Sequence, residues 1–397
     1  MLVGIVGKPS CGKSTFFKAC TLAEIGIANY PFTTIKPNHA MGFVKVRDPA
    51  LDFNKHSNPR FGYIQGEWRF VPVDMIDVAG LVPGAHEGEG MGAQFLSDLN
   101  QADCLIHVID ISGSVNEKGE ACAPLSYDPL KDVTFLEDEL DFWYLDILKR
   151  SWDKMSRQAT MEKQEPHKSI AKQMSGLGAD EENVARISKK IGVEGKVLIN
   201  WTDDELFKFA RELRILTKPM MIAANKIDVP GAEKNLARIK EAFPHYHIVP
   251  CSSAAEVSLR EAVKQHLIEY IPGENTFEIT GQVTDKQKMG LEFIKANILV
   301  KHTSTGVQQV LNHAVFELLK YKPIYPGGVS KLEDSEGRVI PDCFLMKEKA
   351  TALDFAFKLH TDFGKHFIKA VNVKTKMPTG KDHILEPGSI IEIMAGK

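Results

Sequence analysis

One motif near the start of the chain constrains its fold more than any other feature. The stretch from Gly7 to Ser14 reads GKPSCGKS and matches the pattern G-x-x-x-x-G-K-[ST]. Residues 2–6 form a short apolar run that predicts a buried strand, and the residues from Thr15 to Leu22 can form a helix. A strand, a glycine-rich loop and a helix in this order are typical of P-loop proteins. The sequence therefore predicts an α/β fold with a phosphate site where the first helix begins.

The residue types in this loop explain how it would hold a phosphate. Its glycines let the backbone curl, so that successive N–H groups point toward one anion. We expect Lys13 to contact the β- and γ-phosphates and the Ser14 hydroxyl to ligate Mg²⁺. The nucleotide-binding residues predicted in this loop are Gly7, Lys8, Pro9, Ser10, Cys11, Gly12, Lys13, Ser14 and Thr15.

Further apolar runs predict the rest of a sheet. These candidate strands are Val71 to Asp77, Cys104 to Ile111, Met220 to Ala224, and Ile248 to Cys251. Helical patterns lie between them. Strands that alternate with helices indicate a mostly parallel sheet with helices on both faces.

A second motif, D-x-x-G, closes the strand that ends at Asp77. The Asp77 carboxylate can reach Mg²⁺, and the Gly80 N–H can approach the γ-phosphate. Thr33 and Thr34 lie between this motif and the first one, and a threonine hydroxyl there could bind Mg²⁺ in a segment ordered by the triphosphate. From the chemistry alone, a plain loop explains this threonine pair equally well.

A third motif predicts which base is bound. Asn225, Lys226 and Asp228 belong to an N-K-x-D sequence after a predicted strand. A carboxylate at Asp228 can accept hydrogen bonds from guanine N1–H and the 2-amino group, whereas adenine offers neither pairing. Asn225 can tie the loops together, and the Lys226 stem can cover the base. The next strand is followed by the further candidate base-contacting residues Ser252, Ser253 and Ala254. We therefore expect GTP and GDP as ligands.

The remaining chain predicts two further domains. Residues 133–217 read as helix after helix, with a capping box from Thr202 to Glu205, and suggest a helical insertion, although ordinary helices of the core fold remain an alternative. Helical stretches after residue 273 lead to short strands with glycine and proline turns. The predicted domains are a GTPase domain of 1–132 and 218–320, a helical insertion of 133–217, and a small α+β domain of 321–397.

Composition limits the class of protein. With 43% hydrophobic residues, 25% charged residues and a net charge of −3, a globular protein is expected, and wholesale wrapping of nucleic acid is disfavoured. No run reaches the roughly 18 apolar residues of a membrane span. The six cysteines form no C-x-x-C pair, which argues against a zinc site or a disulfide framework. We expect a cytoplasmic protein without membrane contacts. Oligomeric state is not encoded in these patterns, and a monomer is the default expectation.

Several ordered blocks carry a resemblance to a known family. They are Tyr30 to Thr34, Asp77 to Ala85, Gly88 to Gly92, Ala350 to Ala352 and His360 to Gly364. The chain resembles translation-factor-class GTPases of the Obg family, in the YchF-related branch, over nearly its whole length. The resemblance implies a P-loop NTPase fold with a helical insertion and a C-terminal TGS domain of ubiquitin-like β-grasp fold. It also implies association with the ribosome or RNA, and it favours Thr34 as the switch threonine and a Mg²⁺ ligand beside Ser14 and Asp77.

The chain departs from the family pattern in two places. YchF proper lacks N-K-x-D and accepts ATP, so Asp228 points to the guanine-preferring side. The family P-loop often has an asparagine associated with potassium-assisted hydrolysis where this chain has Ser10, which leaves potassium dependence open.

The catalytic group is not evident in the sequence. Leu81 occupies the position after D-x-x-G where small GTPases often have a water-orienting glutamine. We expect slow hydrolysis driven by Mg²⁺ and Lys13 electrostatics, with water positioned by His86, Glu87, the backbone or an activating partner. A YchF-type ATPase and an RNA-binding regulator with a nucleotide-sensing site remain alternatives. The second rests on the insert lysines Lys149, Lys154, Lys163, Lys168, Lys172, Lys189 and Lys190. A P-loop metabolite kinase would leave N-K-x-D unexplained.

Overall fold

The computed structural model describes residues 1–397 except 22–37, 79–97, 163 and 397. The described chain divides into two compact units, one of residues 1–17 and 75–254 and the other of residues 18–74 and 255–397. The chain passes from one unit to the other within α1 (Lys13–Thr21), β4 (Trp68–Asp77) and α9 (Ser253–Lys264). Each unit contains hydrophobic clusters of its own.

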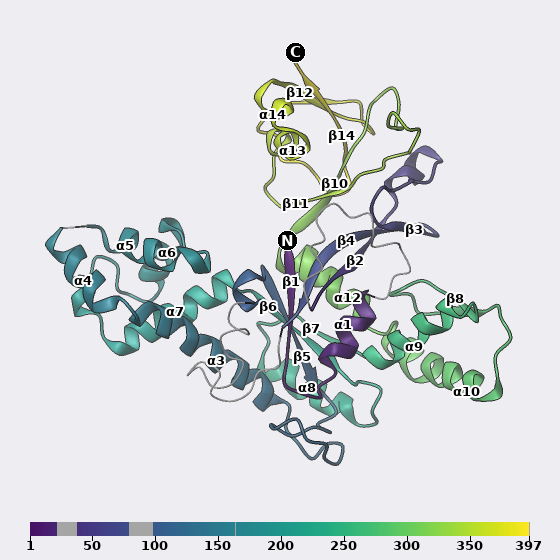
Figure 1. Ribbon diagram of the computed structural model, residues 1–397, viewed down its shortest axis with the longest axis horizontal. Coiled ribbons are helices and arrows are strands. Elements are labelled where there is room, and N and C mark those ends of the chain that lie inside the picture. The colour runs from purple at the N-terminus through teal and green to yellow at the C-terminus, as the bar shows by residue number, and fades with distance from the viewer. Residues whose placement is uncertain (22–37, 79–97, 163, 397) are drawn as a thin grey trace. The chain divides into compact units, whose positions relative to one another are not determined.

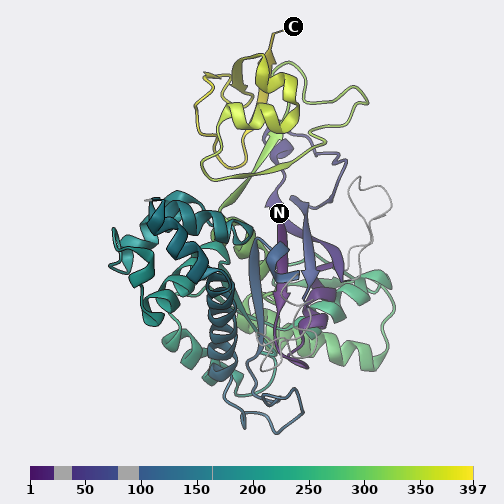
Figure 2. The ribbon, with the colours of Figure 1, turned by 60° about the vertical axis from the view of Figure 1, so that its left-hand side comes forward.

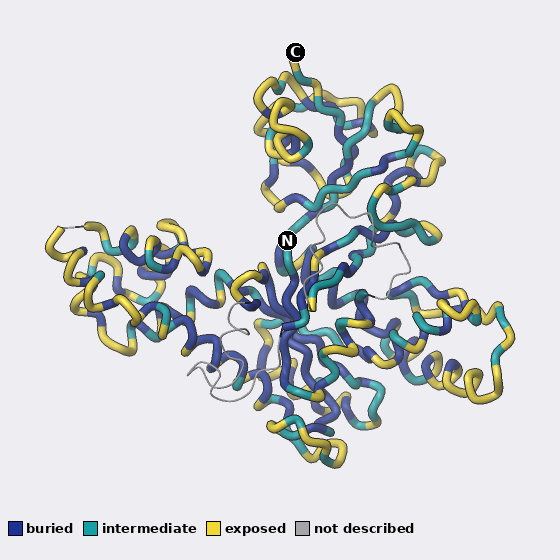
Figure 3. Tube along the Cα trace, in the orientation of Figure 1, coloured by how far each residue is buried: buried dark blue, intermediate teal, exposed yellow. Residues whose placement is uncertain are grey.

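The first unit is built on parallel strands. They are β1 (Leu2–Val6), β5 (Cys104–Asp110), β6 (Met220–Asn225) and β7 (Ile248–Cys251), in the order β1-β5-β6-β7, with the end of β4 beside β1. Every residue of β5 and β6 is buried, as Figure 3 shows in dark blue. Strands buried on both faces read as continuous apolar runs, which is why the sequence located β5 and β6. All four strands were located within one residue at each end.

The helical insertion lies between β5 and β6 in the chain. Its helices are α3 (Leu130–Lys149), α4 (Trp152–Met161), α5 (Pro166–Met174), α6 (Glu181–Lys190) and α7 (Asp203–Thr217). They lie together in one group (Figures 1 and 2). The predicted capping box of α7 is present, with the Glu205 N–H donating to Thr202 Oγ1 at 3.3 Å and the Thr202 N–H donating to Glu205 Oε2 at 2.7 Å.

The insertion and the sheet share one core. A single hydrophobic cluster runs from the strand residues Val6 and Leu105 to Trp143 on α3 and Phe209 on α7. The helical segment therefore packs as part of the first unit, and α8 (Ala232–Ala242) adds a smaller cluster through Ile239. The domain boundaries given from the sequence stay a prediction.

The second unit contains strands that the sequence analysis did not predict. β2 (His39–Arg47) and β3 (Tyr63–Gln65) belong to the same sheet as β4, and β3 pairs antiparallel with β4. The sheet is thus mixed. β2 mixes polar and charged residues with apolar ones and is only partly buried, so its apolar signal is weaker than that of a strand buried on both faces.

Helices and short strands continue the second unit after α9. They are β8 (Ile268–Tyr270), β9 (Phe277–Ile279), α10 (Asp285–Ile294), α11 (Val300–His302) and α12 (Val307–Asn312). Wider π-helical turns follow α10 at Lys295–Leu299 and α12 at His313–Leu318. The helical stretches expected after residue 273 are therefore present, and α10 and α12 are each followed by an irregular turn.

The C-terminal part has the expected α+β fold. Its strands are β10 (Tyr321–Pro326), β11 (Phe344–Lys347), β12 (Phe367–Asn372), β13 (Pro378–Thr379) and β14 (Ile390–Ala395), and its helices are α13 (Ala352–Leu359) and α14 (Thr361–Lys365). The strand order is β11-β10-β14-β12-β13, with β10 and β14 parallel. Phe355 of α13 packs on Ile324, Ala370 and Ile391 of the sheet, which gives a β-grasp arrangement. Among the described residues, no helix has both the length and the apolar character needed to cross a bilayer.

A buried ion pair fastens two helices of the insertion and gives a first prediction. Arg214 of α7 donates from Nε to Asp141 of α3 at 2.8 Å, and both side chains are at most 2% exposed. Arg214→Ala leaves a buried carboxylate without this partner, so we expect the free energy of unfolding to fall by about 3–5 kcal/mol. Urea unfolding followed by tryptophan fluorescence measures this, because three of the four tryptophans lie in the insertion.

Lys208→Ala is the matched control, since its ion pair with Asp204 is exposed. We expect a change of less than about 1 kcal/mol there. If both variants lost the same free energy of unfolding, the buried ion pair would contribute no more to stability than the exposed one.

Candidate functional site

The loop after β1 contains a glycine in the left-handed backbone region, packed against Asn225. Gly12 has φ +96°, and a Cβ atom there would lie 2.2 Å from Nδ2 of Asn225, so no larger residue fits without a shift. The helix α1 begins at Lys13, two residues earlier than predicted, because Phe16 N–H already donates to the Gly12 carbonyl at 2.8 Å. Lys13 and Ser14 thus lie in the first turn of a helix, where backbone N–H groups attract anions.

Three predicted phosphate and metal residues meet at this turn. The Lys13 ammonium donates to Oδ1 of Asp77, and the Ser14 hydroxyl donates to Oδ2 of the same carboxylate at 3.2 Å. Asp77 is brought here because it ends β4 and the next residue, Val78, donates its N–H to the Ile5 carbonyl of β1 at 3.0 Å. The roles assigned to these residues stay predictions. Thr33, Thr34, Gly80, Leu81, His86 and Glu87 lie outside the described residues.

Hard oxygen donors of this kind suit Mg²⁺. The Asp77 carboxylate and the Ser14 hydroxyl are neighbours, and Mg²⁺ takes few protein ligands because it keeps several waters and phosphate oxygens. Within the described part of the chain, no group of three or more histidine, cysteine or acidic side chains could hold a metal. The donors present therefore fit a magnesium ion shared with a phosphate rather than a site made by protein alone.

Asn225 joins the two predicted binding loops. Its Nδ2 donates to the Cys11 carbonyl at 3.1 Å, and its Oδ1 accepts from the Ser253 N–H at 3.0 Å and the Ser253 hydroxyl at 2.8 Å. Ser252 and Ser253 are buried, whereas Ala254 is exposed. The residues predicted to surround a base are therefore fixed to the phosphate loop by a buried amide.

Asp228 is the last residue of the N-K-x-D motif. It lies in a turn closed by the Val229 N–H and the Lys226 carbonyl at 3.2 Å, and it is half-buried. No other side chain in the part of the chain that the structure describes forms a hydrogen bond or ion pair with it. Within those described residues its acceptor oxygens are unused, which is the arrangement that the predicted role in base recognition requires.

Lys226 contacts Asp110, a residue that was not predicted from the sequence. Its ammonium donates to the Ser10 carbonyl at 3.2 Å and to Oδ2 of Asp110 at 3.0 Å. Asp110 is fully buried and also accepts hydrogen bonds from Ser112 and Ser114. Asp110 ends β5 just as Asp77 ends β4, and that strand-end position was the signal that could have identified it.

Lys8 differs from what its place in the motif suggests. Its side chain is 6% exposed and turns into the protein, where Nζ contacts Asp132 at 2.8 Å and the Val115 carbonyl at 2.8 Å. The Tyr127 ring lies 3.8 Å from Nζ, and its hydroxyl donates to Asp132 at 2.9 Å. The Lys8 ammonium therefore anchors the base of the loop, and its backbone alone is left for a nucleotide.

The remaining loop residues have simple placements. Cys11 is buried, and burial raises the pKa of its thiol to about 12, so it stays protonated and unreactive near neutral pH. Pro9 lies against Gly119, where a Cβ would come within 2.7 Å of the proline Cβ. Ser10, Ser14 and Thr15 are exposed on the open side of the loop.

The Lys8 anchor gives a second prediction. Asp132→Asn leaves a buried ammonium without its counter-charge, and we expect unfolding free energy to drop by about 3–5 kcal/mol. We also expect weaker nucleotide binding, because the Lys8 backbone belongs to the loop. Denaturant titration and GDP titration measure the two effects. Glu117→Gln removes the same charge from an exposed site on the neighbouring loop and should change neither.

Three family models match parts of this chain. A model of 50S ribosome-binding GTPases matches residues 2–136, the G4 motif-containing domain of YGR210-like Obg-like GTPases matches 223–328, and the TGS domain matches 335–395. The last match confirms the predicted C-terminal domain.

Relatives match over the whole chain. A GTP-binding protein of Methanocaldococcus jannaschii is 42% identical, with 99% of each chain covered. The crystal structure of a GTP-binding protein from Pyrococcus horikoshii OT3 has 36% identity, full coverage of both chains and a TM-score of 0.78. The ribosome-binding ATPase YchF of Escherichia coli O157:H7 is 28% identical, with 98% of each chain covered. Since the likeness extends through the phosphate loop, the base loop and the TGS domain alike, this chain belongs to the Obg-like family of GTP-binding proteins that includes YchF.

Proposed function

We propose that this protein is a nucleotide switch that binds GTP or GDP with Mg²⁺ and hydrolyses GTP slowly. The observation that carries the proposal is the contrast within one turn between Asn225, which is locked to the phosphate loop, and Asp228, whose carboxylate has no side-chain partner among the described residues. An unpaired carboxylate beside an organised loop matches the paired donors of guanine N1–H and its 2-amino group.

The phosphate end of the site supports a triphosphate ligand. Lys13 and Asp77 pair with each other at the first turn of α1. A bound nucleotide would bring its own partners for both, phosphate oxygens for the ammonium and Mg²⁺ for the carboxylate. Ser14 would join Asp77 at the metal, and Thr34 is proposed as a further ligand. Mg²⁺ would neutralise phosphate charge there, and the N–H groups of the loop would orient the phosphates.

We propose slow hydrolysis because the position after D-x-x-G has no side chain that can orient the attacking water. Leu81 has neither a donor nor an acceptor with which to orient water. Lys13 and Mg²⁺ can stabilise charge on the phosphates without positioning the attacking water. An activating partner, or a group such as His86 or Glu87, would have to supply that function.

Ribosome association is proposed from a relative. The Escherichia coli relative is named a ribosome-binding ATPase, and it aligns with 98% of this chain at 28% identity. We propose that the present protein likewise acts on the ribosome or RNA in the cytoplasm. The same name makes ATP the alternative substrate, although N-K-x-D with Asp228 favours guanine over adenine.

The lysines of the helical insertion give only weak support to the hypothesis of an RNA-binding regulator, because several of them form ion pairs. Lys149, Lys168 and Lys190 pair with Asp203, Glu165 and Glu212 at 2.5, 2.9 and 2.5 Å. These three lysines, whose charges are matched in this way, attract phosphate weakly. The nucleotide site therefore remains the feature with the most specific chemistry.

Base recognition gives a third prediction. Asp228→Asn replaces one acceptor pair with an amide, so we expect the affinity for GDP to fall by about 100-fold, or ~3 kcal/mol. Xanthosine diphosphate carries a carbonyl where guanine has the 2-amino group, so it should bind the variant better than GDP does. Calorimetry with GDP, ADP and xanthosine diphosphate measures this, and the rescue excludes misfolding as the cause. If ADP competes equally with GDP for the unaltered protein, the role proposed for Asp228 is wrong, and the result supports the alternative that the protein is an ATPase.

Turnover gives a fourth prediction. Purified protein with GTP and Mg²⁺ should hydrolyse on the order of 10⁻⁴–10⁻² s⁻¹, the range of GTPases without an activator. Phosphate release under single-turnover conditions measures it, and Lys13→Ala should abolish it. A rate on the order of 1–10 s⁻¹ from the protein alone would show a self-sufficient catalyst and contradict the proposal.

A further inference from the structure

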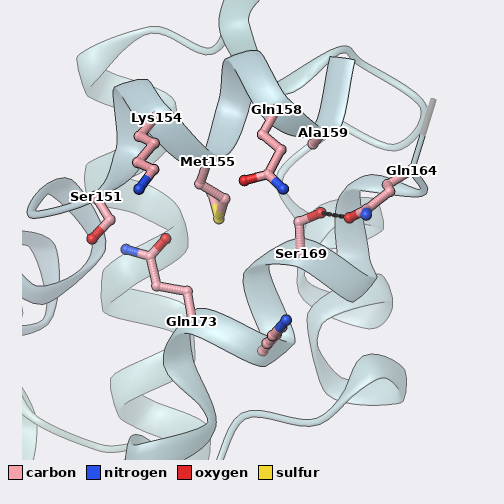
Figure 4. Close-up of a pocket in the computed structure, with 9 residues that line it drawn as sticks. Ser151, Lys154, Met155, Gln158, Ala159, Gln164, Ser169 and Gln173 are labelled. Atoms are coloured by element: carbon pink, nitrogen blue, oxygen red, sulfur yellow. Dashed lines mark hydrogen bonds between the residues drawn. The ribbon is translucent and has the colours of Figure 1, made fainter. Parts of the chain in front are cut away.

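The helical insertion contains a cavity of about 430 Å³ between α4 and α5. All of its lining residues lie between Ser151 and Gln173, so it shares none with the P-loop or the base loop. Figure 4 shows side chains from both helices converging on the space. Its volume lies in the lower part of the range of small-molecule sites, about 300–1,000 Å³.

The lining is positively charged. Lys154 and Lys172 line the cavity, and no aspartate or glutamate does. Neither ammonium lies within 4.0 Å of a carboxylate among the residues that the structure places, whereas Lys149 and Lys168 on the flanking turns are paired. Ser151, the N-cap of α4, also lines the cavity, and its hydroxyl makes no capping hydrogen bond.

The nearby carboxylate of Glu162 is already engaged. Nε2 of Gln158 donates to one of its oxygens at 2.8 Å, and Nε2 of Gln164 donates to the other at 2.5 Å. Oε1 of Gln164 in turn accepts from the Ser169 hydroxyl at 3.0 Å, as Figure 4 shows. These bonds hold the cavity-lining amides in place, and neither Lys154 nor Lys172 takes part in them.

Gln173 lines the cavity and has a hydrogen-bond acceptor, Oε1, without a partner. Its Nε2 donates to the carbonyls of Ile147 and Leu148 at 3.2 and 2.8 Å, in the last turn of α3. This fixes the amide, and Oε1 is buried without a hydrogen-bond partner. In Figure 4 that oxygen points into the space between the helices. A buried acceptor is costly to leave unpaired, so a ligand that carries an N–H or O–H donor would be favoured here once the lining side chains shift to uncover Oε1.

The floor of the cavity is apolar. Met155 and Ala159 lie four residues apart on α4 and therefore face the same side of the helix. A methionine side chain adapts its shape and makes favourable contact with a flat ring. Cations near the rim, a fixed amide acceptor and an apolar floor together fit a molecule with an anionic group, hydrogen-bond donors and a flat body.

We propose that the cavity between α4 and α5 is a second ligand site, which binds a small phosphate-bearing molecule of mononucleotide size. Lys154 and Lys172 neutralise the phosphate, Gln173 accepts a hydrogen bond from the base or sugar, and Met155 packs against the ring. The same chemistry occurs in a free nucleotide and in one nucleotide of an RNA, and the two sources are separated by the test. The proposal is independent of the function proposed for the P-loop.

The test uses the full chain with GDP and Mg²⁺ in excess, titrated with 5′-AMP by calorimetry. We expect binding that weakens at least about tenfold in Lys154→Ala/Lys172→Ala. Lys168→Ala/Lys189→Ala removes two exposed lysines of the insertion outside the cavity and should bind 5′-AMP as the unaltered protein does. GDP affinity, measured separately, should be equal in both double variants, which shows that both are folded. If GDP fails to bind even the unaltered protein, the P-loop proposal fails, and the 5′-AMP result still tests the cavity by itself.

A short single-stranded RNA provides the second arm. If 5′-AMP displaces the RNA from the unaltered protein, the site is supported and an RNA nucleotide is one of its sources. The proposal is overturned if millimolar 5′-AMP and inorganic phosphate both fail to bind. It is equally overturned if the two double variants lose 5′-AMP binding to the same extent, or if RNA binds through Lys154 and Lys172 while 5′-AMP does not.

Discussion

The hydrogen bonds of one buried amide, Asn225, determine how the candidate nucleotide site is arranged. The side chain donates to the Cys11 carbonyl of the phosphate loop and accepts from the backbone and hydroxyl of Ser253, at 2.8 to 3.1 Å. An aspartate has no donor for the first contact, and a leucine has neither a donor nor an acceptor. The amide also lies where any side chain on Gly12 would clash, so the position of the asparagine requires a glycine there. Without this connection, Asp228 and Lys13 would sit on loops with no fixed spacing between base and phosphate.

The fold could be predicted from the sequence where burial is continuous. β5 and β6 are buried at every residue, and such strands read directly as apolar runs. The Thr202 capping box located the start of α7 because its signal is local. β2 and β3 escaped prediction because they are partly exposed and mix polar with apolar residues. The β-grasp order of the C-terminal strands also depends on pairings between distant segments, so the resemblance to a family supplied it and periodicity could not.

The site could be predicted only as far as its motifs are contiguous. Lys13, Asp77 and Asp228 stand at fixed offsets in short patterns, and the first two meet in the structure. Lys8 and Asp132 are 124 residues apart, and nothing in the sequence near either one indicates the other. The motif allows any residue at the position of Lys8, so its pattern does not tell a buried anchor from a ligand contact. Pairings across this separation come from the parallel sheet, which places the ends of β1 and β5 beside each other.

One helix connects the phosphate loop with the cavity of the insertion. Asp132, in the first turn of α3, contacts Lys8, while the carbonyls of Ile147 and Leu148, in its last turn, hold Gln173. The 20 residues of α3 span about 30 Å. Its inner face belongs to the core cluster that also contains strand residues, so α3 is packed along its length rather than hinged. A packed helix keeps the distance between its ends constant, so a displacement of the Lys8 backbone would carry the wall of the cavity with it. Energetic coupling between the two sites also requires that α3 have two arrangements that differ in ligand affinity. The packing of the core cluster on the inner face of α3 sets the free-energy difference between those two arrangements.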